Sequence, residues 1–369
     1  MNNKQEQIKY IGGEIEITDS ESTVKNLGLR DKYSLYTSGR TAIVNILKTI
    51  QPQYTVLLPS YLCESIIQPF KTLGFNYSFY KINIDLSIDH DFLINKIEET
   101  RCSAIYYINF MGFMSDLDIR QIKEIDNDIV FIEDCTHSTF IPNEVNGLKN
   151  TGDIVFGSLR KTLPVSDGAY ILNSNNISSF NAQLIDTHFS DFKKYGKTLR
   201  SLFLNNRKLT DLESIYLNIL SMAEYELNRE IPNTQMSESS FTILEHLNLE
   251  EIYSKRRSNY KRLYDYFLKD QNISQIGYPL KNIADNEMPY MLPFFVSKGN
   301  RNELRENLRD HGIFTAVIWA IIDEVDPIIF EESYNLSNNI LCFPIDQRYL
   351  DDDMYYLISK FKQIVQNKK

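Results

Sequence analysis

Hydrophobic positions along residues 36–135 follow two alternating periods. In residues 39–50, apolar side chains recur every three or four positions, as in a helix with one buried face. Residues 54–60 are a nearly continuous apolar run, typical of a strand covered on both faces. The alternation predicts helices at 39–50, 64–75, 89–100 and 118–125 and strands at 54–60, 76–83, 103–110 and 128–135. This rhythm is typical of an α/β fold with a mostly parallel sheet and crossover helices.

The pattern changes after residue 152. Residues 152–174 predict two strands joined by a turn, and the polar residues 178–232 predict a helical insertion. Residues 239–268 predict one long helix. A smaller α/β unit is predicted from residues 290–297, 300–313 and 339–346. We therefore expect a large domain at 1–240 that contains the insertion, and the long helix with a small C-terminal domain at 241–369.

The composition and charge of the chain argue against several classes of protein. The 369 residues carry a net charge of −10, which argues against a nucleic-acid or anionic-membrane partner. No stretch approaches the ~20 apolar residues of a transmembrane helix, and the first ten residues lack the apolar core of a signal peptide. The four cysteines are widely spaced, and no His/Cys cluster has the spacing of metal ligands. We expect a cytoplasmic protein without a metal.

A candidate phosphate site precedes the first helix of this alternation. Ser38 and Gly39 stand immediately before residues 40–50. The unpaired backbone N–H groups at a helix start, helped by the positive end of the helix dipole, bind phosphate well. An ordinary N-cap explains the same residues equally simply.

A carboxylate and a histidine follow the buried strand of residues 128–135. Asp134 and His137 lie at its carboxyl end, where ligands bind in parallel sheets. A buried carboxylate needs a partner, because an unpaired buried charge is costly. The alternative is a turn-capping aspartate beside a histidine with local hydrogen bonds.

A third candidate is Lys161, in the turn predicted inside residues 152–174. It lies 161 − 134 = 27 positions after Asp134, among small and apolar residues, and Ser158 precedes it. A lysine is usually a solvated surface residue, so this position alone proves little. Asn233, before the predicted long helix, is by itself only a capping residue.

Taken together, these residues match the needs of pyridoxal 5′-phosphate (PLP). A pyridine nitrogen that stays protonated needs a carboxylate, which Asp134 supplies. The aldehyde needs a lysine for a Schiff base, which Lys161 supplies. The phosphate needs a helix start with hydroxyl groups, which residues 38–41 and Ser158 supply.

At these residues the chain resembles the DegT/StrS family of PLP-dependent sugar aminotransferases, which have the type I aspartate-aminotransferase fold. The resemblance covers most of the chain and is most specific around Lys161. It is carried by residues 36–43, 56–66, 132–138, 152–171, 233–244 and 343–361. It implies a large mostly parallel-sheet domain with a smaller C-terminal α/β domain.

The resemblance also implies roles for single residues. Lys161 forms the Schiff base and moves a proton, Asp134 pairs with the ring nitrogen, and His137 contacts the ring or its 3′-oxygen. Gly39 lies in the phosphate turn, and Asn233 reaches the phosphate of the neighbouring subunit in a homodimer. The remaining implied cofactor contacts are Arg40, Thr41 and Ser158 at the phosphate and Cys63, or in its place Tyr61, at the ring.

Several features are left open. An anionic sugar nucleotide needs a basic patch, for which Arg40, Arg160 and residues 254–262 are candidates, although the last also suit a solvated helix face. Trp319 lies in a segment that resembles the family's substrate-side loop, and it suits core packing equally.

The function implied is transfer of an amino group from glutamate, or glutamine, to a keto-sugar. The sugar would be nucleotide-linked and serve cell-surface polysaccharide or secondary-metabolite biosynthesis. Two alternatives remain: a PLP enzyme of another outcome, dehydratase-like or carbon–carbon bond-forming, and a non-catalytic binding module. Sugar dehydratases of the family have histidine at the lysine position, so Lys161 favours amine transfer.

Overall fold

A seven-stranded sheet forms the centre of the protein in a computed structural model. The structure describes residues 8–17, 28–50, 54–138, 151–172, 188–285 and 287–367. In sheet order, the strands are β2 (Tyr33–Tyr36), β8 (Ala169–Leu172), β7 (Ile154–Ser158), β6 (Val130–Asp134), β5 (Cys102–Ile108), β3 (Thr55–Pro59) and β4 (Tyr77–Tyr80). The strands from β7 to β4 run parallel, and at one edge β8 pairs antiparallel with both β7 and β2.

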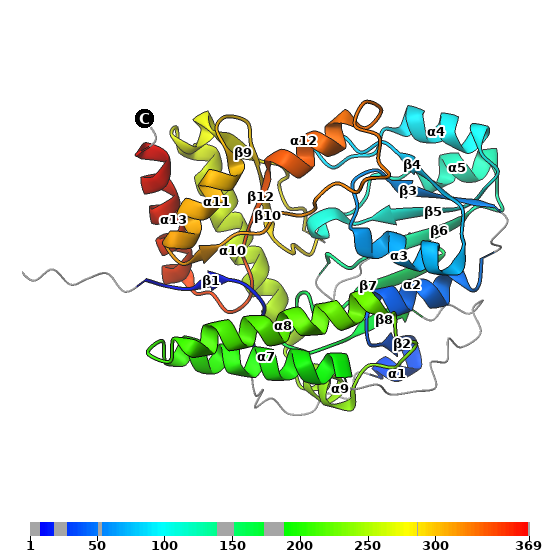
Figure 1. Cartoon of the computed structure of the whole chain (residues 1–369). Helices are drawn as coiled ribbons and strands as arrows, with labels where there is room; N and C mark the ends of the chain where they lie inside the picture. Colours follow the sequence, from blue (N-terminus) through cyan, green and yellow to red (C-terminus); the bar gives the residue numbers. More distant parts are fainter. Residues whose placement is uncertain are drawn as a thin grey trace, which may run out of the picture.

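Helices follow the strands as the hydrophobic pattern predicts (Figure 1). Residues Val56, Leu57 and Leu58 of β3 have no exposed surface, which explains why this strand is apolar without alternation. The helices of this region are α1 (Leu29–Lys32), α2 (Gly39–Leu47), α3 (Glu64–Leu73), α4 (His90–Glu99), α5 (Ile119–Ile125) and the short 3₁₀ helix η1 (Phe110–Gly112). The predicted α/β alternation is confirmed.

Strand register places the ends of three strands side by side. Ile108 of β5 pairs with Asp134 of β6, and Asp134 pairs with Phe156 of β7. The carboxyl ends of these parallel strands therefore meet at one edge of the sheet. This edge is where ligands bind in open α/β folds.

A second, three-stranded antiparallel sheet lies in the C-terminal part. Its strands in order are β12 (Ile340–Phe343), β10 (Leu292–Val296) and β9 (Gly277–Pro279). The N-terminal strand β1 (Ile11–Gly12) pairs with β11 (Ile313–Phe314), so the start of the described chain lies against this part. The helices of this C-terminal part, apart from those described below, are α11 (Arg301–Asp310), α12 (Glu331–Asn339), α13 (Asp351–Gln366) and the short 3₁₀ helix η2 (Ile273–Gln275). The domain division at residue 240 stays a prediction.

The predicted single helix at 239–268 is wrong, because the chain forms two helices there. These are α9 (Glu238–Glu245) and α10 (Leu249–Lys269). The Asn248 side chain accepts a hydrogen bond from the backbone N–H of Glu251 at 3.3 Å. This N-cap starts a new helix, although the apolar periodicity continues across the break.

The predicted insertion contains a helical hairpin. Its helices are α7 (His188–Asn205) and α8 (Asp211–Arg229), which Figure 1 shows packed side by side below the central sheet. They approach closely at Gly196, where a Cβ atom would lie 2.7 Å from Leu220. Residues 178–187 of the predicted insertion lie outside the described residues. Within the described ranges, no helix is both long and apolar enough to cross a membrane.

Candidate active site

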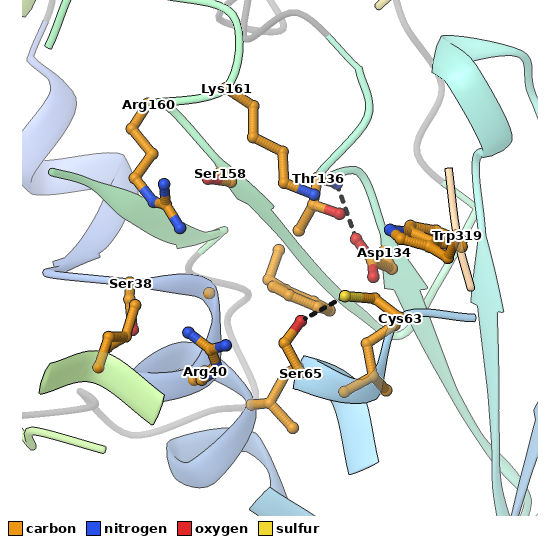
Figure 2. A pocket seen from close by; sticks show the side chains of 15 residues that line it. Ser38, Arg40, Cys63, Ser65, Asp134, Thr136, Ser158, Arg160, Lys161 and Trp319 are labelled. Atoms are coloured by element: carbon orange, nitrogen blue, oxygen red, sulfur yellow. Dashed lines mark hydrogen bonds between the residues drawn. The ribbon is translucent and has the colours of Figure 1, made fainter. Parts of the chain in front are cut away.

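A pocket lies at the edge where β6 and β7 end and where α2 and α3 begin (Figure 2). Most of the site residues predicted from the sequence line it: Gly39, Arg40, Cys63, Asp134, Ser158 and Lys161. These residues come from distant parts of the chain, and the strand register and the start of α2 bring them together.

Asp134 is the last residue of β6 and is only 1% exposed. Its Oδ1 accepts a hydrogen bond from the backbone N–H of Thr136 at 2.7 Å, and the Tyr106 hydroxyl donates to its Oδ2. Burial raises the pKa of Asp134, whereas these two donors act to lower it. The carboxylate is thus held in a fixed orientation at the pocket, as a binding partner for a cationic ring nitrogen has to be.

Lys161 lies in the turn that follows β7. The ends of this turn are joined by a hydrogen bond from the Leu159 N–H to the Gly168 carbonyl at 2.9 Å. Gly168 has a φ of +130°, a conformation that a side chain rarely adopts, which explains the glycine at this position. Burial lowers the pKa of the Lys161 ammonium, while the nearby Asp134 carboxylate acts to raise it. A lowered pKa favours the neutral amine, which is the form that attacks a carbonyl carbon.

The start of α2 supplies hydrogen-bond donors to the other end of the pocket. The Ser38 side chain caps the helix by accepting from the Thr41 N–H at 3.2 Å, so the ordinary capping role is present. Gly39 and Arg40 follow at the first positions of the helix and line the pocket. The Nε atom of Arg40 is buried and has no hydrogen-bond partner within the described chain. A phosphate here would satisfy that donor and the first N–H groups of the helix, so the residues present suit the group.

Two predicted phosphate contacts do not line the pocket. Thr41 is fully buried, and its hydroxyl donates to the Pro232 carbonyl at 2.7 Å. Asn233 is exposed, and its Oδ1 accepts from the Asn45 amide of the same chain at 3.0 Å. Within one chain, neither side chain reaches the pocket.

His137 lies behind the pocket in a stack of three rings. Its ring centroid is 5.0 Å from that of Tyr290 and 4.7 Å from that of Trp319, with interplanar angles of 22° and 25°. The Met111 N–H donates to its Nδ1 at 3.4 Å, and burial lowers its pKa well below the usual value. His137 is therefore neutral and supports Trp319.

Trp319 both lines the pocket and packs against the hydrophobic core, so the structure is compatible with each of its two possible roles from the sequence. Its indole lines the pocket, as does Cys63, whereas Tyr61 is fully buried with its ring centroid 5.5 Å from that of Trp319. Figure 2 shows Trp319 near Asp134 and Cys63, and away from Ser38.

The basic segment 254–262 is a solvated helix face only in part. Arg256 and Arg257 are buried, at 1% and 9% exposure, whereas Lys261 is exposed. Arg256 donates to the Tyr290 carbonyl at 3.0 Å and to the Thr162 carbonyl at 3.3 Å. Its guanidinium fixes the residue next to Lys161 and cannot also receive a substrate anion.

Sequence reasoning missed several lining residues, among them Thr136 and Leu227. Thr136 lies two positions after Asp134, so the strand-end position of that aspartate could have indicated it. Leu227 comes from the α7–α8 hairpin, and nothing in its local sequence indicates that α8 reaches the pocket.

No protein-family model matches the chain, but solved structures do. The PLP form of the putative sugar aminotransferase Spr1654 from Streptococcus pneumoniae matches with a TM-score of 0.67 and 14% identity, over 97% of this chain and 99% of that one. A DegT DnrJ EryC1 StrS aminotransferase from Brucella abortus matches with a TM-score of 0.59 and 14% identity, over 90% and 85%. The chain has the fold of these sugar aminotransferases.

The predicted fold class and the resemblance in fold are thereby confirmed. The sugar aminotransferase CalS13 from Micromonospora echinospora gives the same result, with a TM-score of 0.59, 15% identity, and coverage of 90% and 87%. Because the identities are this low, the similarity establishes the fold, and the chemistry follows from the pocket.

A different protein is similar in sequence over part of the chain. The serine/threonine-protein kinase GIN4 from Saccharomyces cerevisiae is 26% identical over 183 residues, which is 47% of this chain. This chain spans only 15% of the length of that kinase. The described residues have the aminotransferase fold, so this partial match carries no argument for kinase chemistry.

Proposed function

We propose that the chain is a PLP-dependent aminotransferase that acts on a keto-sugar. The observation that carries this proposal is the meeting of Asp134, Lys161 and the start of α2 in one pocket. PLP, when bound, supplies an electron sink for the carbon that carries the amino group. The three elements would bind its ring nitrogen, its aldehyde carbon and its phosphate.

The chain's own groups supply the rest of the chemistry. Asp134 keeps the ring nitrogen protonated, because a buried carboxylate stabilises the cationic form. Lys161 binds the cofactor covalently and then serves as the base that carries a proton between two carbons. Cys63 and Trp319 would contact the ring, and His137 would act through Trp319.

We also propose that glutamate, or glutamine, donates the amino group and that the acceptor is a nucleotide-linked keto-sugar. Support comes from the matched structures, which are named sugar aminotransferases. Sugars of this kind would serve cell-surface polysaccharide or secondary-metabolite biosynthesis.

A homodimer is part of the proposal. Asn233 is exposed beside α2, at the edge of the central sheet where Gln235 forms a bridge with Tyr36 of β2. It is therefore open to a second copy of the chain, and we propose that it reaches the phosphate bound there.

The half-reaction with the donor tests the proposed function. Glutamate added to the purified PLP-loaded protein should remove the visible absorbance of the cofactor and release 2-oxoglutarate, as ping-pong covalent catalysis requires. A screen of nucleotide-linked keto-sugars on the aminated protein then identifies the acceptor. The Lys161→Ala variant is the negative control. If no common amino acid changes the spectrum, the chain is not an aminotransferase, and the dehydratase-like and binding-module alternatives lead.

A further inference from the structure

The last two turns of α8 form part of the pocket. Leu227 lines it directly. Glu224 and Asn228 lie one helical turn apart on the same side of α8. Each of them contacts one of the two arginines that line the pocket, so the hairpin contributes to the site as well as covering it.

The first of these contacts is an ion pair. Arg160 Nη1 donates to Glu224 Oε1 at 3.0 Å, and the Arg160 side chain is 19% exposed. In the second contact, Arg40 Nη2 donates to Asn228 Oδ1 at 2.5 Å. Both guanidinium groups are thereby fixed from the side of α8, and both arginines line the pocket.

Glu224 is itself firmly held. Its Oε1 also accepts from Lys193 Nζ of α7 at 2.7 Å, and Lys193 is fully buried and paired with Glu14. Although burial alone would raise it, Arg160 and Lys193 lower the pKa of Glu224 to about 2. Glu224 is therefore ionised at neutral pH and anchors Arg160 to both helices of the hairpin.

The charges at this end of the pocket do not balance. Arg40 and Arg160 bring two positive charges, and Glu224, shared with Lys193, brings one negative charge. A guanidinium has five N–H donors, and each of these two arginines uses only part of them in the contacts above. The buried Arg40 Nε without a partner in the described residues marks where a further acceptor is missing.

We infer that Arg160 is a ligand of the cofactor phosphate and that the α7–α8 hairpin holds it in place through Glu224. This inference rests on the proposed function. Figure 2 shows Arg40, Arg160 and Ser158 on the side of Ser38, whereas Asp134 and Trp319 lie on the other side. The two arginines therefore face the phosphate end of the pocket. The insertion supplies a charged contact that the start of α2 alone does not provide.

A comparison of PLP with pyridoxal, which lacks the phosphate, tests the contact. Trp319 is the only tryptophan of the chain and lines the pocket, so its fluorescence reports binding of both compounds to the apo-protein. Arg160→Gln should weaken PLP binding about 10- to 100-fold, the range for one charge-assisted hydrogen-bond contact, and change pyridoxal binding less than about 2-fold. Arg160→Lys should recover part of the loss, because it keeps the charge. Arg30→Gln, which breaks an exposed ion pair with Glu238, is the matched control.

Glu224→Gln tests the role of the hairpin. Without the carboxylate, Arg160 lacks its counter-charge in the apo-protein, so the apo melting temperature should fall. The phosphate then replaces the ion-pair partner that Arg160 has lost, so PLP should raise the melting temperature by more than it does in the wild type, whereas pyridoxal should not. Glu226→Gln on the same helix, which breaks the surface pair with Arg229, should change neither value.

The outcomes separate this inference from the proposed function. If the wild type binds neither PLP nor pyridoxal covalently, the proposed function fails. If the wild type binds both covalently but Arg160→Gln keeps the same preference for PLP over pyridoxal, only the role of Arg160 is overturned. Equal stabilisation of Glu224→Gln by PLP and pyridoxal would overturn the role of the hairpin. Should Arg160→Gln not fold, a preference for PLP over pyridoxal in Arg160→Lys that equals the wild-type preference would overturn the role of Arg160.

Discussion

Replacing Asp134 by asparagine removes the negative charge of this side chain and so tests how much that charge contributes to catalysis. The two side chains have nearly the same shape, and Asp134 is buried at the end of β6, so no water can take its place easily. An amide cannot stabilise a protonated ring nitrogen as a carboxylate does. We expect turnover to fall by at least ~10²-fold, the scale set by losing one preorganised electrostatic contact.

A smaller cost in stability follows from the hydrogen bonds of Asp134. Its two oxygens accept from the Tyr106 hydroxyl and the Thr136 N–H. Asparagine has only one acceptor oxygen, so one of these donors loses its partner and faces an NH₂ group. We expect a loss of about 1–3 kcal/mol in the free energy of unfolding, which a folded domain of ordinary stability tolerates.

Single-turnover stopped-flow measurement of the glutamate half-reaction reports the chemical effect, and thermal unfolding reports the structural one. Tyr106→Phe is the matched control, because it removes one donor and leaves the charge of Asp134 in place. It should lower the rate by clearly less than Asp134→Asn does, because it removes one hydrogen bond and keeps the negative charge. The reasoning is refuted if Asp134→Asn turns over at the wild-type rate, or if Tyr106→Phe loses as much as Asp134→Asn does.

Three further predictions follow from other contacts. Arg256→Leu removes the buried donor to the carbonyls of Pro289 and Tyr290, whereas the Thr162 carbonyl keeps a bond from Gln347, so the free energy of unfolding should fall by about 2 kcal/mol or more in urea titrations; an unchanged midpoint contradicts this. Mixing inactive Lys161→Ala and Asn233→Ala chains should restore activity in heterodimers; heterodimers that form and stay inactive count against a shared site. Because the folded-state pKa of Glu224 lies at about 2, below the ordinary 4.5, its stabilising effect is complete above pH ~4.5 and is lost as the pH falls toward 2. The melting temperatures of wild type and Glu224→Gln should therefore converge in acid, and a gap that widens would be contrary to this.

Local patterns in the sequence were sufficient for the central sheet except for its edge strand β2, which was not predicted. The apolar runs from residue 54 to 135 are long, and their alternation with helical periodicity has one physical solution, a sheet covered on both faces. Asp134 could be placed at a strand end because the apolar run stops there, and parallel strand ends gather at one edge.

Long-range contacts explain what the sequence did not reveal. Arg256 looked like part of a solvated charged face, but its partners are backbone carbonyls more than thirty positions along the chain. The break between α9 and α10 depends on the N-cap hydrogen bond of Asn248, whereas the apolar periodicity of the sequence continues across this break. Glu224 reaches Arg160 only because the hairpin folds back on the sheet. Periodicity reports which face of an element is buried, but not which element covers it.

The most direct test of the account is to trap the cofactor on the chain. Purified protein is incubated with PLP, reduced with borohydride, digested and mapped by mass spectrometry, because reduction makes the link to a lysine amine permanent. The account predicts a pyridoxyl group on Lys161, and its loss in Lys161→Ala. A label on another lysine, or no label at all, would contradict the assignment of this pocket as the active site.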